Sequence, residues 1–119
     1  MSTTLRNPKA TPNRVSRVNN PTEIFIHWRA GMTDPTDNPI RITLTIPPEH
    51  PLFFLNVNDQ RVKQVIWDKD YLPGTNEYDD NVFVVVGSAP AQHTNVKIMM
   101  STMDSNGFPN TQAFTLQYV

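Results

Sequence analysis

The sequence predicts an all-β protein, specifically an immunoglobulin-like antiparallel β-sandwich of about seven strands with an extended N-terminal arm. Three observations predict this fold. The β-branched residues, which are 11 valines, 7 isoleucines and 13 threonines, far outnumber the 5 alanines and 6 leucines that favour helices. Eleven prolines divide the 119 residues into short runs. Several of those runs alternate apolar and polar residues with the two-residue period of a half-buried strand.

The first 22 residues predict a separate basic segment, because they contain three prolines, no acidic residue and no apolar periodicity. Their basic residues are Arg6, Lys9, Arg14 and Arg17. We therefore divide the chain into an extended arm, residues 1–22, and a sandwich domain, residues 23–119. The arm carries +4, and the body, with the remaining 6 basic and all 11 acidic residues, carries −5. A solvated tail that binds nothing is the alternative.

The first two strands of the sandwich are predicted over residues 23–29 and 40–46. In each run every second residue is apolar, so one face of the strand enters the core. The dipeptide Pro47-Pro48 ends the second strand, because proline cannot donate a hydrogen bond to a neighbouring strand. Residues 31–39 between them are rich in turn-forming residues and predict a loop.

A hairpin is predicted next, with strands over residues 52–57 and 61–67. The intervening Asn58-Asp59 suits a tight turn, because both residue types tolerate positive φ. The alternative is a helical turn, since the apolar residues of 61–67 also fit helical spacing after a capping residue. Residues 68–81 then predict a long acidic loop.

The remaining runs predict a buried central strand and a closing pair. The continuous apolar run 82–86 is typical of a strand covered on both faces. Residues 96–103 and 111–119 are joined by a segment containing Asn106-Gly107, a strong turn signal, so we expect these two strands to pair and to hold the C-terminus in the sheet. A small jelly roll or barrel is the alternative architecture.

The composition argues against most enzymes and against membrane insertion. There is no cysteine, which excludes disulfides and cysteine-built metal sites, and four glycines form no phosphate-binding loop. The histidines His27, His50 and His93 lack the spacing of a metal site or a catalytic triad. No apolar run approaches a membrane span or a secretory signal. We therefore expect a non-enzymatic protein without a cofactor.

The acidic loop offers a different function. The segment from Gly74 to Val86 resembles the acidic loop and valine-rich strand of small calcium-mediated bacterial sugar-binding lectins. The resemblance implies that Glu77, Asp79 and Asp80 bind Ca²⁺ and that the ion holds sugar hydroxyls. Carboxylate oxygens from a loop are the ligands that calcium selects. The sequence departs from that family because two predicted strands follow the loop and the chain ends in Val119.

The arm predicts an assembly function. A proline-containing extended segment loses little conformational freedom on docking, and its charge complements an acidic surface. The expected partner-binding residues are Leu5, Arg6, Lys9, Arg14 and Arg17. The layout of sandwich and arm resembles the decoration or cement proteins of tailed-phage capsids. That resemblance implies capsid subunits and copies of this chain as partners, and a location on the virion surface; otherwise we expect a cytoplasmic protein. The arm contains no aromatic residue to stack on a base, so we expect no sequence-specific nucleic-acid binding.

Overall fold

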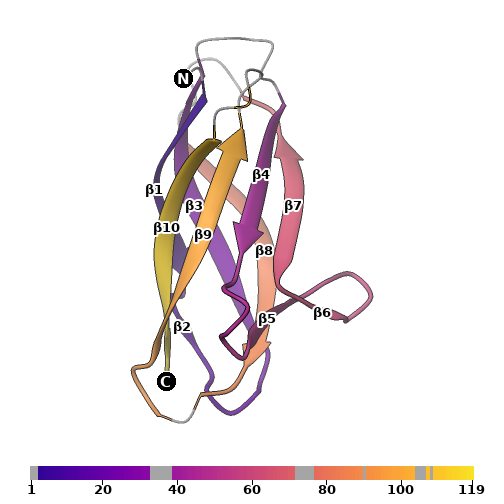
Figure 1. The fold of residues 1–119 in the computed structure, drawn as a ribbon, viewed down its shortest axis with the longest axis vertical. Helices are drawn as coiled ribbons and strands as arrows, with labels where there is room; N and C mark the ends of the chain where they lie inside the picture. Colours follow the sequence, from indigo (N-terminus) through magenta and orange to yellow (C-terminus); the bar gives the residue numbers. More distant parts are fainter. Residues whose placement is uncertain (1–2, 33–38, 72–76, 90, 104–106, 108) are drawn as a thin grey trace.

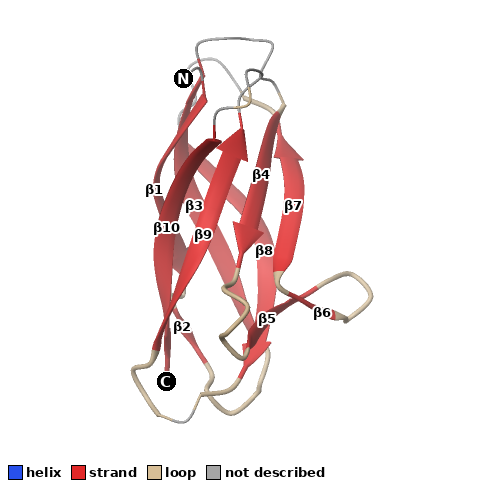
Figure 2. Cartoon of the chain, in the orientation of Figure 1, coloured by secondary structure: helices blue, strands red, loops and turns tan. Residues whose placement is uncertain are grey.

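The computed structural model describes residues 3–32, 39–71, 77–89, 91–103, 107 and 109–119. These residues form ten strands in two facing five-stranded sheets (Figures 1 and 2) and contain no helix that could cross a membrane. In chain order the strands are β1 (Thr3–Thr11), β2 (Arg14–Val15), β3 (Thr22–Met32), β4 (Ile40–Thr45), β5 (Leu52–Leu55), β6 (Arg61–Val62), β7 (Gln64–Lys69), β8 (Glu77–Gly87), β9 (Asn95–Met103) and β10 (Pro109–Tyr118).

Strands that are distant in the sequence are neighbours in both sheets. One sheet has the order β1-β3-β8-β5-β6 and the other the order β2-β10-β9-β4-β7. Seven of the strands, β1-β3-β8-β5 and β10-β9-β4, follow the order of immunoglobulin-like sandwiches. The structure has ten strands rather than the expected seven or so, because the short β2 and β6 and the strand β7 are additional to these seven. Every ladder is antiparallel except the one between β2 and β10.

The core lies between the sheets because alternate residues of each long strand turn inward. On β3 the inward residues are Ile24, Ile26 and Trp28, each no more than 2% exposed. β4 follows the same period, with Ile40, Ile42 and Leu44 buried. The predictions for residues 23–29 and 40–46 are thus confirmed. The prediction of a central strand is also confirmed, because β8 lies between β3 and β5.

Residues 3–22 are not an arm, and the division of the chain at residue 22 is corrected. β1 pairs with β3 along its length, and Leu5 is 1% exposed within the core. The sequence concealed this strand because β1 contains a bulge between Arg6 and Lys9. Thr3 and Leu5 face the core before the bulge, and Ala10 faces it afterwards, so the inward positions change from odd to even numbers.

The segment after β1 is also part of the sandwich. The amide of Gln117 donates to the Asn13 carbonyl at 2.9 Å, and the amide of Val119 donates to the Val15 carbonyl at 2.9 Å. The amide of Asn19 donates to the Gly87 carbonyl at 2.8 Å. These bonds confirm that the C-terminal strand is held in the sheet, and they show that the N-terminal segment helps to hold it there.

The region from residue 52 to residue 81 needs two corrections. The hairpin is confirmed, because β5 pairs with β6 around a turn in which Asp59 has a φ of 57°. The run 61–67 is not one strand, however, because the chain leaves the first sheet at Lys63 and continues as β7 in the second. Residues 77–81 belong to β8 rather than to a loop. The final pairing of β9 with β10 is confirmed.

Candidate functional site

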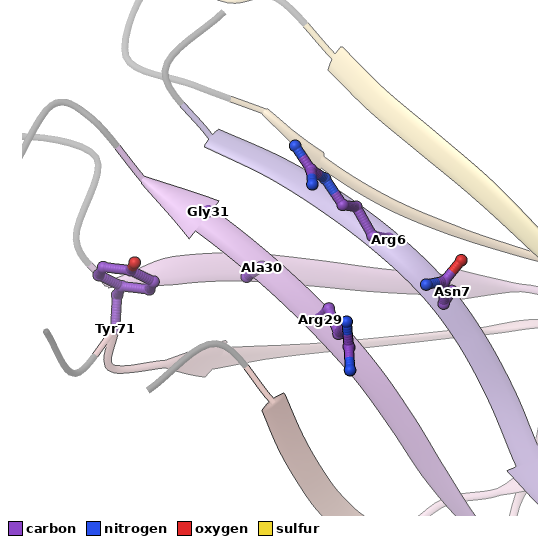
Figure 3. Close-up of a pocket in the computed structure, with 6 residues that line it drawn as sticks. All are labelled: Arg6, Asn7, Arg29, Ala30, Gly31 and Tyr71. Carbon is purple, nitrogen blue, oxygen red and sulfur yellow. The ribbon is translucent and has the colours of Figure 1, made fainter. Parts of the chain in front are cut away.

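A cavity of about 350 Å³ lies beside β1 and the last residues of β3. It is lined by Arg6, Asn7, Arg29, Ala30, Gly31 and Tyr71. Figure 3 shows Arg6 and Asn7 on β1, next to Arg29 on β3, with Tyr71 on the other side of β3 in this view. Both arginines and Asn7 are exposed, and Tyr71 is half-buried. The cavity therefore combines two guanidinium groups with an amide and an aromatic ring.

The ladder between β1 and β3 brings the two arginines together. Arg6 and Arg29 are direct partners in the register of this antiparallel pair, and opposed residues place their Cβ atoms roughly 5 Å apart. The bulge follows immediately, where Asn7 has a φ of 50°. A bulge bends and twists a strand, and here it presents the amide of Asn7 beside Arg6 in the cavity. The neighbouring Gly31 faces Thr4, whose Oγ1 atom lies 3.1 Å from where a Cβ atom would stand.

Aromatic packing supports the tyrosine of the cavity. The ring centroid of Tyr71 lies 6.5 Å from that of Tyr78, which stacks on Trp28 at 4.7 Å. The Nζ atom of Lys69 lies 5.9 Å from the centroid of the Tyr78 ring. Trp28 and Tyr78 are both buried. Tyr71 therefore stands on a packed base that extends into the core.

Charged residues form two rows across β1, β3 and β8. In the first row the backbone register aligns Arg6, Arg29 and Glu77. In the second row it aligns Lys9, His27 and Asp79. The first row contains two arginines and one glutamate, so its formal charge is positive. Two like charges that face each other across a ladder destabilise it unless an opposite charge is near.

The expected partner-binding residues do not form one continuous surface. Leu5 is buried in the core, so its side chain is not available to a partner. Its burial instead holds β1 on the sandwich. Arg6 and Lys9 are exposed on β1, where the register brings them beside Arg29 and His27. Arg14 is exposed on β2 in the other sheet. Arg17 follows β2 and is half-buried, and its amide and carbonyl bond to the Val119 carbonyl and the Ala89 amide.

The expected calcium ligands have backbone positions that differ from the prediction. Glu77, Asp79 and Asp80 lie in β8, paired with or adjacent to residues paired with β3. Their side chains are outside the described part of the structure. Among the side chains that are described, no group of three histidine, aspartate or glutamate residues is placed to hold a metal ion. Calcium binding stays a prediction, and its test is whether millimolar calcium raises the melting temperature.

Three shifted pKa values belong to residues outside the cavity. Burial lowers the pKa of Lys63, and nearby Glu49 opposes this shift. Burial also raises the pKa of Tyr118, whose hydroxyl has no hydrogen-bond partner among the described residues. The hydrogen bond and charge of Asp68 raise the pKa of the exposed Arg41. These residues bear on stability and on strand pairing rather than on the cavity.

Sequence reasoning missed Asn7, Arg29 and Tyr71 as members of the site. Arg29 was expected in a strand, but its partner in the ladder depends on the pairing of β1, which the bulge concealed. A polar residue directly before Pro8 on a strand signals a bulge, and Asn7 carries that signal. Nothing in the sequence around Tyr71 indicates which strand it approaches.

Comparisons with known proteins do not assign this chain to a family. No protein-family model and no curated protein sequence matches this chain. Among solved structures, the chain is similar to the ASH/PapD-like domain of human CEP192, PapD-like domain 7, with 7% sequence identity and a TM-score of 0.43. The match covers 99% of this chain and 85% of the human domain.

Proposed function

We propose that this protein is a non-enzymatic assembly protein that binds an acidic surface of a partner protein through the exposed face of β1 and β3. The observation that carries the proposal is the direct pairing of Arg6 with Arg29 at the edge of a cavity. A guanidinium group offers paired N–H donors that match the two oxygens of a carboxylate, and the exposed Arg6 side chain can present them to a partner.

Neighbouring residues extend this binding surface. Lys9 and His27 form the next pair of the same ladder, one row beyond the bulge. Phe25, two residues before His27 on β3, is 46% exposed and pairs with Thr11 of β1. Arginine and aromatic side chains are enriched at protein interfaces, where the charges set orientation and the ring supplies buried area.

The proposal keeps the capsid decoration role expected from the sequence, but it assigns the binding to a different surface. A capsid decoration role, with capsid subunits as partners and the virion surface as location, now depends on this basic face, since the N-terminal segment is part of the sandwich. Whether the native protein sediments with a large particle tests that setting. Recovery of the native protein only as a small free species would contradict it.

The basic face itself is tested with an acidic probe. We would titrate the intact protein with a poly-glutamate peptide at low and at physiological salt, using isothermal calorimetry. Arg6→Gln should weaken binding at least fivefold, on the order of 1 kcal/mol. Lys97→Gln is the matched control, because Lys97 is also an exposed cation and lies on β9 in the other sheet. Equal losses in both variants would show unspecific attraction and would contradict the proposed site.

A further inference from the structure

β7 is a regular strand with an open edge. It ends the second sheet, and in the described part of the chain it pairs only with β4, in unbroken register from Ile40–Lys69 to Thr45–Gln64. Figure 1 shows it on the outer side of β4. The other edge strands are less suited to further pairing. β1 carries a bulge and Pro8, and β2 and β6 have two residues each.

The direction of the free backbone groups follows from one hydrogen bond. The amide of Ile46 donates to the Lys63 carbonyl at 2.8 Å. In an antiparallel ladder the N–H and C=O groups of one residue point to the same side, and neighbouring residues alternate. Lys63 and the odd-numbered residues of β7 therefore turn their backbone groups toward β4. Gln64, Ile66 and Asp68 turn theirs toward the open edge.

The side chains at this edge do not oppose an added strand. Ile66 is 57% exposed, although it sits in the middle of β7. Asp68 is the acidic residue of the strand, and its Oδ1 atom lies 3.0 Å from the Nε atom of Arg41. Proteins commonly protect an edge with charge, proline or a bulge. β7 has no proline and no bulge, and its negative charge is already paired.

We infer that β7 pairs antiparallel with β7 of a second copy of this chain, with the two-fold axis at Ile66. In this register Ile66 faces its own counterpart, and Gln64 faces Asp68 of the second copy. All three residues with outward backbone groups then form hydrogen-bonded pairs. The two five-stranded sheets become one continuous ten-stranded sheet, and two open edges are removed.

The inward side chains favour this register over its neighbour. Val65 meets Trp67 of the second copy on the inner face, and aromatic with β-branched pairs stabilise a ladder. Trp67 is already packed in its own chain, with its ring centroid 5.0 Å from that of Phe83. Centring the axis on Trp67 would instead oppose Ile66 to Asp68 and Val65 to Lys69. A second copy therefore complements β7 with apolar pairs at the centre and a polar pair at each end.

The mass of the intact protein tests the pairing. Sedimentation equilibrium over micromolar to millimolar concentrations should show a reversible dimer. Ile66→Pro should leave a monomer, because it removes an outward N–H without breaking the ladder to β4. Ile66→Lys is a second disrupting variant should proline prevent folding. Gln60→Lys is the matched control, because this exposed residue lies in the turn outside β7 and should leave the dimer unchanged. A monomeric wild type at every concentration would overturn the inference.

A cross-link tests the register. The chain has no cysteine, so Ile66→Cys introduces a single thiol. Hydrogen-bonded partners have Cα atoms about 5.5 Å apart, which a disulfide spans. Oxidation with oxidised glutathione should give a covalent dimer of Ile66→Cys at least tenfold faster than of Val57→Cys, whose side chain is 99% exposed in a turn. Equal rates for the two variants would overturn the predicted register.

Discussion

The backbone amide of Leu5 donates a 2.8 Å hydrogen bond to the Oδ1 atom of Asn110, joining strands whose residues are 105 positions apart in sequence. The bond crosses from β1 in one sheet to β10 in the other. It closes the side of the sandwich at which the Leu5 side chain enters the core. The N-terminal segment is thus a structural part of the domain, and its removal has consequences for stability that a free segment would not have.

Leu5→Ala should lower the free energy of unfolding by about 3 kcal/mol, because the side chain is fully buried and leaves a cavity. Arg6→Ala, the exposed neighbour, should change it by less than about 0.5 kcal/mol. Urea unfolding followed by tryptophan fluorescence measures both values. Small and similar effects in the two variants would mean that β1 is not fastened to the core.

Tyr118→Phe should stabilise the protein by about 1 kcal/mol, because the buried hydroxyl has no hydrogen-bond partner among the described residues. The pH dependence gives a second measurement. Burial raises the pKa of Tyr118 above its ordinary value of 10.0, so the folded state holds this proton more tightly than the unfolded state. The associated stability is complete below pH 10.0 and is lost as the pH rises through the folded pKa.

The free energies of unfolding of wild type and Tyr118→Phe should therefore diverge at alkaline pH. Chemical unfolding between pH 8 and 11 should show wild type losing stability relative to Tyr118→Phe, which lacks the titrating group. Parallel curves for the two proteins would contradict the raised pKa.

Gly87→Ala should destabilise the fold by about 2 kcal/mol through overpacking. A Cβ atom at this position would stand 2.3 Å from the Pro51 carbonyl oxygen, a backbone atom that cannot turn aside. The close approach joins the end of β8 to the start of β5, where the amide of Ser88 donates to that same carbonyl at 3.1 Å. Ser88→Ala keeps this amide and should cost little. The difference in melting temperature between the two variants measures the steric effect.

Lys63→Met should destabilise the protein by about 1 kcal/mol. The ammonium group donates to the carbonyls of His50 and Leu52 and lies 4.0 Å from the centroid of the Phe53 ring. These contacts hold the point at which the chain passes from β6 to β7. Lys97→Met, on an exposed strand face, is the control and should have little effect on the melting temperature.

The titration of Lys63 changes the stability of the protein with pH in the opposite direction to that of Tyr118. Burial lowers the pKa of Lys63 from its ordinary value of 10.5, so the unfolded chain binds this proton more tightly. Wild type should gain stability relative to Lys63→Met as the pH rises from the folded pKa to 10.5. A constant difference between the two proteins across this window would contradict the lowered pKa.

Much of the fold was predictable where the local pattern and the final environment agree. β3 and β4 alternate because one face of each is buried, and β8 is continuously apolar near Val85 because it lies in the middle of its sheet. The turn at Asp59 was recognisable because that residue type tolerates a positive φ. In these elements the residues that determine the local conformation are neighbours in sequence.

The candidate site was predictable only in part. Arg6 and Lys9 were identified as exposed basic residues, but Leu5 was assigned to the same surface and lies in the core. Arg29 joined the site through register, which depends on the bulge at Asn7 and on the sheet edge that β1 occupies. The transfer of the chain between sheets at Lys63 likewise has no local signal, because either sheet accepts the same β-branched residues.

The amino-acid sequence by itself determined that this chain forms β-strands, where most of them run and which face of each is apolar, because those properties arise from neighbouring residues. Only the tertiary structure decided that the N-terminal segment completes the sandwich, that Arg6 pairs with Arg29, and that β7 pairs with β4 alone in the described part of the chain. Pairing between strands is a competition among distant segments for the same hydrogen bonds and the same core. Its outcome depends on the whole chain at once.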